Sequence, residues 1–497
     1  GSPMWGGAMT IQYASPTIRN CRFIDCSITG GDGGNGSNGN DGHPIGFDGG
    51  WAGFAYGGAV YIGFLSNPTF ENCLFQNCRA YGGNGGNGGD GQDTAQGGRG
   101  GNWMLSEAIE QSVRLWWDGW EWGPFDRDGN LRSGYFTYMT EAGQDIRGYY
   151  DDYWRYSGFG GAVYIEYYSA PRFIDCNFTD NHTFGGLSGV GADDPLPDDN
   201  YNIENFGGAV YIGNASDPEF IGCVFRENSA DMNTVATPDD VYVSFGGSIA
   251  IENDCAPTFL RCIIEDSNAC AGGGIWTYGS RPTLIDCNLA GNVAYQGGGV
   301  YAVESTGTVR STLFTRNRAF QGIIDPNFLG DPNSPLGGTS ASGGGFCGMN
   351  SPMEIRDSEF TGNRALSSGG AVYFNGSDQD VNVAPLLHNC LIWGNAAGRD
   401  GGGVAISWYN EPIISNCSIV DNAVGGAFSE AFGGGLSVVY DSNAVVTNSI
   451  IWGNVSSDSG SQVAVGSSYA QRPSALQITH SDIQPDLHDE IGRASCR

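Results

Sequence analysis

The chain has 497 residues and a formal net charge of −32, and all of its 22 basic residues are arginine. A surface this acidic repels nucleic acid, anionic membranes and uronate or sulfated polymers, and it leaves neutral partners open. The sequence holds no apolar run near the about 18 residues of a membrane-spanning helix, so we expect no membrane span.

One pattern recurs about twelve times along the chain: Gly-Gly, a β-rich run, a Pro or small turn, Cys, an apolar pair and Asn. Three clear copies start at Gly57 (GGAVYIGFLSNPTFENCLFQN), Gly160 (GGAVYIEYYSAPRFIDCNFTDN) and Gly207 (GGAVYIGNASDPEFIGCVFREN). The weaker copies start near Gly6, Gly246, Gly272, Gly297, Gly343, Gly369, Gly401, Gly433 and Gly460. A period of about 25 residues predicts a solenoid, in which one core runs through all coils.

Each repeat alternates as strands do. Val163 and Ile165 are expected to point into the coil, and Tyr164 and Glu166 to point out. A second extended run follows through residues 173–178, and the glycine pairs supply turns with positive φ. Three short strands per coil predict a parallel β-helix, with the right-handed crossover that parallel strands prefer.

Most cysteines occupy one repeat position, which Thr or Ser takes in other coils. The residues at this position are Cys21, Cys73, Cys176, Cys223, Cys262, Cys287, Thr312, Ser358, Cys390, Cys417 and Ser449. This pattern predicts a column of small inward side chains rather than a disulfide framework. Cys26 and Cys78 instead replace the recurring Asn in successive coils, so one disulfide between these two residues remains an alternative.

The Asn that ends each repeat predicts a second column, because its amide can bond the Asn of the coils above and below. The residues at this position are Asn77, in one of two alignments of its coil, and Asn181, Asn228, Asn292, Asn317, Asn363, Asn395, Asn422 and Asn454.

On these GGA and F-x-x-N repeats, the chain resembles the right-handed parallel β-helix, pectin-lyase-like superfamily, and in particular secreted bacterial surface proteins with polymorphic-membrane-protein-type repeats. The resemblance implies an all-β solenoid of about 12 coils and a secreted or cell-surface location. Residues 448–454 (NSIIWGN) and 480–484 (HSDIQ) resemble the approach to a C-terminal anchor. Such coils host lyases, hydrolases and adhesins, so the resemblance is specific for fold and not for activity.

Five insertions interrupt the repeat between the Asn and the next Gly-Gly. They span residues 30–56, 81–158, 183–205, 230–245 and 320–342. We expect them on one edge of a single β-helix domain over residues 1–489, where they mark a binding face. Residues 490–497 (EIGRASCR) are expected to be a non-native tail from an environmental, metagenomic fragment that lacks its anchor.

The largest insertion differs from the coils in its chemistry. Residues 103–117 have near-helical apolar spacing, which predicts a short α-helix. Four tryptophans lie at and after its end, namely Trp116, Trp117, Trp120 and Trp122. Aromatic rings stack on the apolar faces of sugars, and the neighbouring Asp118 and Glu121 could bond sugar hydroxyls. Packing of the insertion onto the coils is the alternative role for each ring.

Outward aromatic residues also recur on the strand after Gly-Gly. At one-coil spacing the position reads Tyr61, Tyr164, Tyr211, Ala250, Trp276 and Tyr301. Because parallel strands lie about 4.8 Å apart, these rings are expected to form an exposed platform for an extended glycan. Cross-coil stacking for stability alone is the other interpretation.

Two residues further on, Glu166 and Glu252 are expected two coils apart with Gly213 leaving space between them. That separation is roughly the 6.5–9.5 Å of an inverting glycosidase, so these two form the leading acid/base pair. Asp175, Asp118, Glu121 and Asp180 are further candidates. Asp126 and Asp128 resemble half of a calcium loop, which indicates a structural Ca²⁺. We expect that no cofactor is required.

The leading hypothesis is an extracellular glycoside hydrolase that cleaves a neutral glycan, such as a β-glucan, in an aromatic-lined cleft. The alternative is a non-catalytic adhesin or carbohydrate-binding protein. A polysaccharide lyase is disfavoured, because it needs cationic groups near a uronate and the chain is strongly acidic. The sequence leaves the glycan, its linkage and the oligomeric state open.

Overall fold

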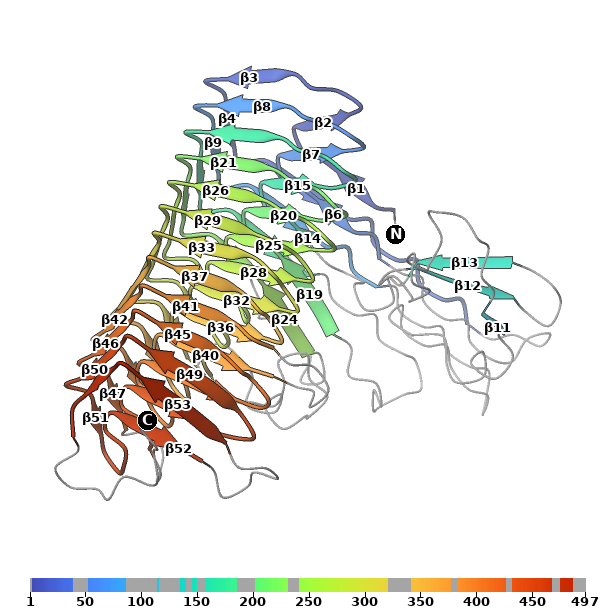
Figure 1. The fold of residues 1–497 in the computed structure, drawn as a ribbon. Helices are drawn as coiled ribbons and strands as arrows, with labels where there is room; N and C mark the ends of the chain where they lie inside the picture. Colours follow the sequence, from blue (N-terminus) through green and yellow to red (C-terminus); the bar gives the residue numbers. More distant parts are fainter. Residues whose placement is uncertain are drawn as a thin grey trace.

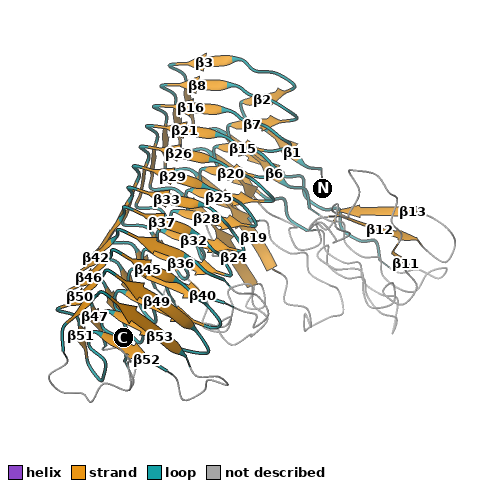
Figure 2. Cartoon of the chain, viewed as in Figure 1, coloured by secondary structure: helices purple, strands orange, loops and turns teal. Residues whose placement is uncertain are grey.

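The chain winds into a solenoid of parallel strands, with its N-terminal coils at one end and its C-terminal coils at the other (Figure 1). This computed structural model describes residues 2–38, 52–85, 158–185, 202–230, 241–320, 341–376, 383–425, 431–466 and 474–485, and the backbone of three short strands between residues 114 and 149. Within these ranges the secondary structure consists of strands and loops (Figure 2). The expected all-β parallel β-helix is confirmed.

Three parallel sheets of 12 strands form the walls, and each coil contributes one strand to each sheet. Sheet I follows the glycine pairs and contains β2 (Met9–Gln12), β7 (Val60–Gly63), β15 (Val163–Ile165), β20 (Val210–Ile212), β25 (Ile249–Glu252), β28 (Ile275–Tyr278), β32 (Val300–Val303), β36 (Phe346–Met349), β40 (Val372–Asn375), β44 (Val404–Ser407), β48 (Leu436–Val438) and β52 (Val463–Val465).

Sheet II comes next in each coil and contains β3 (Thr17–Arg19), β8 (Thr69–Glu71), β16 (Arg172–Ile174), β21 (Glu219–Ile221), β26 (Thr258–Leu260), β29 (Thr283–Ile285), β33 (Thr308–Arg310), β37 (Glu354–Arg356), β41 (Leu386–His388), β45 (Ile413–Ser415), β49 (Asn443–Thr447) and β53 (Ala475–Thr479). Sheet III contains β4 (Arg22–Ile24), β9 (Leu74–Gln76), β17 (Asn177–Thr179), β22 (Val224–Arg226), β27 (Ile263–Glu265), β30 (Asn288–Ala290), β34 (Leu313–Thr315), β38 (Glu359–Thr361), β42 (Leu391–Trp393), β46 (Ser418–Val420), β50 (Ile450–Trp452) and β54 (Asp482–Ile483).

Shorter strands close the corner between sheets III and I. The strands after sheet III, called sheet IV, are β5 (Ser27–Thr29), β10 (Arg79–Tyr81), β18 (His182–Phe184), β23 (Ser229–Ala230), β31 (Val293–Ala294), β35 (Arg318–Ala319), β39 (Arg364–Ala365), β43 (Ala396–Ala397), β47 (Ala423–Val424) and β51 (Val455–Ser456). The strands before the glycine pairs, called sheet V, are β1 (Met4–Trp5), β6 (Ala55–Tyr56), β14 (Gly158–Phe159), β19 (Asn202–Phe206) and β24 (Val241–Phe245).

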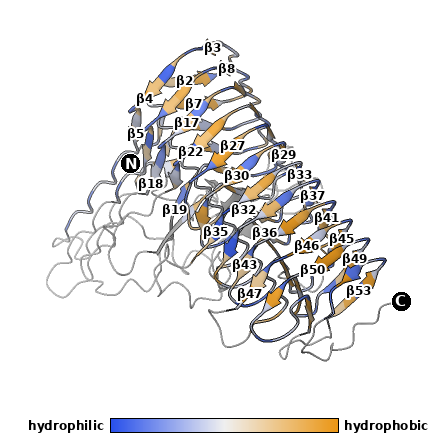
Figure 3. Ribbon diagram, turned by 90° about the vertical axis from the view of Figure 1, so that its left-hand side faces the viewer, coloured by the Kyte–Doolittle hydropathy of each residue, from blue (hydrophilic) through white to orange (hydrophobic). Residues whose placement is uncertain are grey.

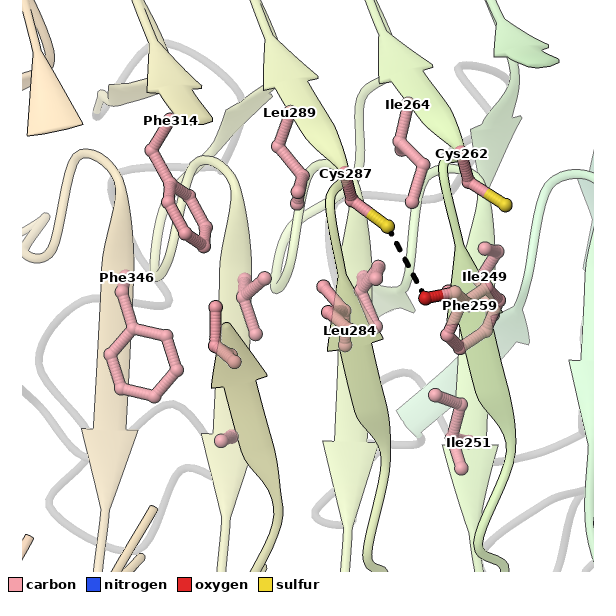
Figure 4. Close-up of a cluster of buried hydrophobic side chains, with 14 of the residues drawn as sticks. Ile249, Ile251, Phe259, Cys262, Ile264, Leu284, Cys287, Leu289, Phe314 and Phe346 are labelled. Carbon is pink, nitrogen blue, oxygen red and sulfur yellow. Dashed lines mark hydrogen bonds between the residues drawn. The ribbon is translucent and has the colours of Figure 1, made fainter. Parts of the chain in front are cut away.

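Equivalent residues of successive coils lie directly over one another. Phe173 in sheet II pairs with Phe70 on one side and Phe220 on the other, and the ring centroids are 5.0 and 4.9 Å apart. The same stacking continues through the core (Figure 4), where the thiol of Cys287 lies 3.4 Å from the carbonyl oxygen of Phe259. The core is therefore a set of columns, and the alignment of the repeat fixes which residues meet.

The inward side chains are the expected ones. Val163 and Ile165 are buried in the main core, and the cysteines of the predicted column join it, apart from the exposed Cys21 of the first coil. Tyr164 points to the other side of sheet I, as expected. Small free thiols thus act as core filling.

The asparagine column is a buried hydrogen-bond ladder. The Nδ2 of Asn317 donates to Oδ1 of Asn363 at 3.0 Å and to the carbonyl of Leu289 at 2.9 Å. Its Oδ1 accepts from both the backbone amide and Nδ2 of Asn292, at 3.1 and 3.0 Å. Each amide therefore satisfies backbone groups at a bend where the strands end, as buried polar groups require.

The prediction was wrong for Asn77, which lies one position before the ladder. Cys78 occupies the ladder position of that coil, and its backbone amide donates to Oδ1 of Asn181 at 3.0 Å. Asn77 has a φ of 53°, and its amide donates to Asp25 on the outside of the coil. The adjacent Asn-Cys pair made the alignment ambiguous by one residue.

The second glycine of each pair meets the next coil. A Cβ on Gly161 would lie 2.0 Å from the carbonyl oxygen of Gly208, and a Cβ on Gly208 would lie 2.1 Å from that of Gly247. Real Cβ atoms do not approach so closely, so this column admits only glycine.

The insertions leave and rejoin the coil at one corner. The segments that follow β5, β10, β18 and β23 of sheet IV return through β6, β14, β19 and β24 of sheet V. The predicted helix over residues 103–117 falls outside the described residues except at β11 (Arg114–Leu115), which is a strand. There it pairs antiparallel with β12 (Tyr135–Met139), which pairs in turn with β13 (Asp145–Tyr149).

The outer faces of sheets II and III change along the solenoid. The first coils carry ion pairs between adjacent coils, such as Arg19 with Glu71 at 2.6 Å. The last coils carry exposed apolar side chains instead, including Val445, Ile450 and Trp452. The strands β46 and β50 are coloured as hydrophobic in Figure 3.

The ladder predicts a specific loss of stability on Asn317→Ala. The substitution removes four side-chain hydrogen bonds and leaves the amide of Asn292 and the carbonyl of Leu289 buried without this partner. We expect a loss of about 3 kcal/mol, measured as a shift of the urea unfolding midpoint. Asn177→Ala, at an exposed strand position, is the control and is expected to change stability by less than about 0.5 kcal/mol. Equal effects of the two substitutions would contradict the ladder.

Candidate functional site

The aromatic residues predicted on sheet I lie in register, as expected, but they are buried rather than exposed. Tyr164 pairs with Tyr61 and Tyr211, and the ring centroids are 5.7 and 4.8 Å apart. Yet Tyr61, Tyr164, Tyr211 and Trp276 are all at most 5% exposed. The prediction of a solvent-exposed platform for a glycan was therefore wrong.

The cause is a second aromatic layer contributed by sheet V. Phe159 packs edge-on against Tyr211 with a centroid distance of 5.1 Å, and Phe206 lies 5.6 Å from Trp276. These phenylalanines directly precede glycine pairs, and Phe245 does so in the next coil. An aromatic residue before Gly-Gly is thus the sequence signal that marks the covered part of sheet I.

Glu166 directly follows β15 and accepts hydrogen bonds from three side chains. The hydroxyl of Tyr61 donates to its Oε1 at 2.5 Å, and the hydroxyl of Tyr164 donates to its Oε2 at 2.8 Å. Nδ2 of Asn214, in the next coil, donates to Oε2 at 3.2 Å. Glu166 is 6% exposed, and the three hydrogen bonds compensate its carboxyl group for the lost water.

Glu252 repeats this arrangement two coils further along. It is 2% exposed, the hydroxyl of Tyr211 donates to its Oε1, and Nδ2 of Asn253 lies 3.3 Å from the same oxygen. The hydroxyl of Tyr211 can reach Glu252 because Gly213, beside its ring, has no side chain. A Cβ on Gly213 would lie 2.8 Å from the hydroxyl oxygen of Tyr211. The space expected above Gly213 is therefore filled by the tyrosine.

The two glutamates are consequently brought onto one edge, two coils apart as predicted, but without the open space that an acid/base pair needs. Asp175 does not join them. It is exposed at the bend between sheets II and III, where its Oδ1 would lie 2.4 Å from a Cβ on Gly222. Asp180 contacts His182 at 2.8 Å beyond sheet III.

The remaining predicted site residues lie outside the described residues. They are Trp116, Trp117, Asp118, Trp120, Glu121, Trp122, Asp126 and Asp128. A structural Ca²⁺ at the last two stays a prediction. The described residues alone contain no group of three or more His, Cys, Asp or Glu side chains that could hold a metal ion.

Exposed and half-buried aromatic residues instead gather on the bend after sheet I. Tyr13, Phe64 and Tyr167 occupy one position of the first three coils, and their rings stack at 5.5 and 4.8 Å. Leu65 and Tyr168 follow in their coils and are 62% and 46% exposed. We call these five residues the aromatic turn strip.

The backbone of the strip is strained for such side chains. Phe64, Leu65, Tyr167 and Tyr168 have φ values between 52° and 59°, in the left-handed region. That region suits Gly, Asn and Asp and is unfavourable for bulky residues by about 1 kcal/mol or more each. The fourth coil has Asn214 at this position. Backbone strain of this kind is often found at functional sites.

A similar group lies on the same bend near the other end of the solenoid. Trp408 stacks on Tyr440 with a centroid distance of 4.9 Å, and it is 40% exposed. Nη2 of Arg399 donates to the hydroxyl of Tyr440 at 2.7 Å. The sequence predictions missed both groups, because they followed the strands rather than the bends.

A sequence profile described as "Right handed beta helix region" matches residues 231–384 and 333–483, together more than half of the chain. The chain belongs to the right-handed β-helix family. Among solved structures, this β-helix is similar to the periplasmic alginate epimerase AlgG, with 9% identity, a TM-score of 0.30 and coverage of 66% of this chain and 74% of the epimerase chain. The comparison with curated protein sequences found no match to this chain. In the described part of the β-helix, no helix is long and apolar enough to cross a membrane.

The tyrosine–glutamate cluster predicts a loss of stability at alkaline pH. Burial, and next the charge of Glu166, raises the pKa of Tyr61 and of Tyr164; burial and Glu252 do the same for Tyr211. In the unfolded chain these phenols ionise near pH 10. The contribution of these tyrosines to the free energy of unfolding should thus be fully present below about pH 10. It should be lost as the pH rises above this value, because the unfolded state then releases protons that the folded state retains.

The measurement is urea unfolding from about pH 8 to about pH 11, together with the ultraviolet absorbance of tyrosinate. The late-titrating tyrosines should ionise only as the chain unfolds. Tyr164→Phe should reduce the alkaline loss. A loss that is unchanged in this variant would contradict the role of the cluster.

Proposed function

We propose that this β-helix binds a neutral glycan through the aromatic turn strip and acts as a carbohydrate-binding protein on the outside of the cell. The observation that carries the proposal is the exposure of Tyr13 and Tyr168, at 74% and 46%, on a left-handed bend. The fifth coil has Asn253 and Asp254 at the two equivalent positions.

The chemistry of the bend fits a sugar. Aromatic rings offer an apolar surface, and polar side chains beside them bond hydroxyl groups. Asn67 and Asp217 are exposed beside the strip, two coils apart, and Oδ1 of each accepts from a backbone amide of the next coil at 2.8 and 2.7 Å. The net charge of −32 favours an uncharged polymer over a uronate or sulfated one.

Binding is tested by affinity electrophoresis and calorimetry against a panel of neutral polysaccharides. We expect Tyr13→Ala and Tyr168→Ala each to weaken binding about 3- to 10-fold, which corresponds to about 0.5–1.5 kcal/mol for one aromatic contact. Trp452→Ala is the control, since Trp452 is equally exposed at 45% but lies on the outer face of sheet III. Equal losses in all three variants, or no binding to any neutral glycan, would overturn the proposal.

Hydrolysis of the bound glycan is the second candidate function. It is favoured by the position of Glu166, which directly precedes Tyr167 of the strip, with Glu252 two coils away on the same edge. Two carboxyl groups at such a separation suit an inverting glycoside hydrolase. The hydrogen bonds from Tyr61 and Tyr164 would have to yield to substrate for Glu166 to act.

This candidate is tested by the release of reducing ends from neutral polysaccharides such as β-glucans. If Glu166 is the catalytic acid or base, Glu166→Gln should lower the rate at least about 100-fold while binding is retained. Release at the same rate in both proteins would assign hydrolysis to other residues. No release from the wild-type protein would leave glycan binding as the function.

A further inference from the structure

The first coil is the exposed end of the described solenoid. Its strands β2, β3 and β4 are the terminal members of the three walls, so each has a neighbouring strand on one side only. Terminal strands are the places where a sheet opens most easily. This coil also carries Tyr13 of the aromatic turn strip, which rests on Phe64 of the second coil.

Two cysteines face each other across this end. Ile24 pairs with Gln76 at the end of sheet III, and Ser27 pairs with Arg79 at the start of sheet IV, so Cys26 and Cys78 are opposite by register. The backbone amide of Arg79 donates to the carbonyl of Cys26 at 2.8 Å and fixes this alignment.

Both side chains point into the same core. Cys78 is buried, and Cys26 is half-buried and packs on that core. The thiol of Cys78 contacts the carbonyl of Phe23, in the first coil, at 3.5 Å, so it is directed toward that coil. Parallel neighbours about 4.8 Å apart lie within the Cα separation that a disulfide spans, about 4.4–6.8 Å.

This pair differs from the column of cysteines in the core. In that column Cys176, Cys223 and Cys262 succeed one another, so each thiol has two possible partners. At the Cys78 position the next coil has Asn181, which bonds the backbone of Cys78 instead. The half-exposed Cys26 also gives small molecules access to the pair.

We propose that Cys26 and Cys78 form a cross-coil disulfide under oxidising conditions, which locks the first coil and the Tyr13 end of the strip onto the second coil. The oxidant is a small-molecule disulfide such as oxidised glutathione. The thiolate of Cys26 attacks one of its sulfurs and releases one glutathione thiolate. The thiolate of Cys78 then attacks the Cys26 sulfur and releases the second. One disulfide forms, one is reduced, and the two protons go to the glutathione thiolates.

The reaction should be slow at neutral pH. Burial raises the pKa of the Cys26 thiol, and burial followed by the neighbouring Cys26 raises the pKa of the Cys78 thiol to about 12. Because the thiolate is the attacking species, the rate should rise with pH.

The experiment treats the full chain with oxidised or reduced glutathione at about pH 8.5 and then alkylates the remaining thiols. Trypsin cleavage after Arg22 and Arg79 yields the peptide 23–79, which contains Cys26, Cys73 and Cys78. We expect this peptide to carry three alkyl groups in the reduced sample and one in the oxidised sample, and the oxidised peptide to be two hydrogens lighter than a singly alkylated peptide with two free thiols. Fragmentation should place the only alkyl group of the oxidised peptide at Cys73.

The oxidised chain should also resist brief tryptic cleavage at Arg19 and Arg22 at least about tenfold more than the reduced chain, because the first coil opens less often. Cys26→Ser, at the half-exposed position, should abolish both effects. Cys21→Ser, which removes the other thiol of the first coil, should leave both unchanged.

Two results would overturn the proposal. One is full alkylation of Cys26 and Cys78 after oxidation. The other is a disulfide between Cys21 and Cys73 in place of the proposed one. Glycan binding is measured separately on the reduced chain, so failure of the disulfide and failure of the proposed function are distinguishable.

Discussion

The structure depends on hydrogen bonding between successive coils at a constant spacing. Because every wall is a parallel sheet, each residue lies over its equivalent in the next coil, and a side chain must be compatible with a copy of itself. Phenylalanines meet this condition by stacking, and thiols by filling small spaces. Asparagines meet it by bonding to one another and to the backbone, as Asn317 and Asn363 do.

The same condition limits where function can reside. A strand position is committed on its inner side to the core, and in the first coils sheet V covers the outer side of sheet I as well. The bends have more freedom, since their side chains need only tolerate a left-handed backbone. Tyr167 and Tyr168 occupy such a bend although Asn would fit the backbone better. The preference of the bend for Asn therefore does not explain the aromatic side chains of the strip.

The repeat was sufficient to predict the fold, the number of coils and the register. Periodicity reports direction relative to the coil, and this is why the pairing of Tyr61, Tyr164 and Tyr211 was correct. It does not report what lies outside the coil, so Phe159 and Phe206 hid rings that alternation alone places in solvent. The left-handed φ of the bends is likewise absent from the repeat pattern. The prediction of Glu166 as an open acid was wrong because two of its three partners, Tyr61 and Asn214, come from other coils, and Tyr61 is 105 residues away in the sequence.

The glycine column bears on how such a chain can change over evolutionary time. A substitution at Gly161 or Gly208 would force two coils apart along the whole length of the contact. The glycine column therefore tolerates almost no single substitutions. Gain or loss of a complete coil, in contrast, preserves the contacts between the glycines of successive coils. Lineages of this protein should consequently differ in the number of coils and in their bends, and the glycine seam should be inherited in whole-repeat units.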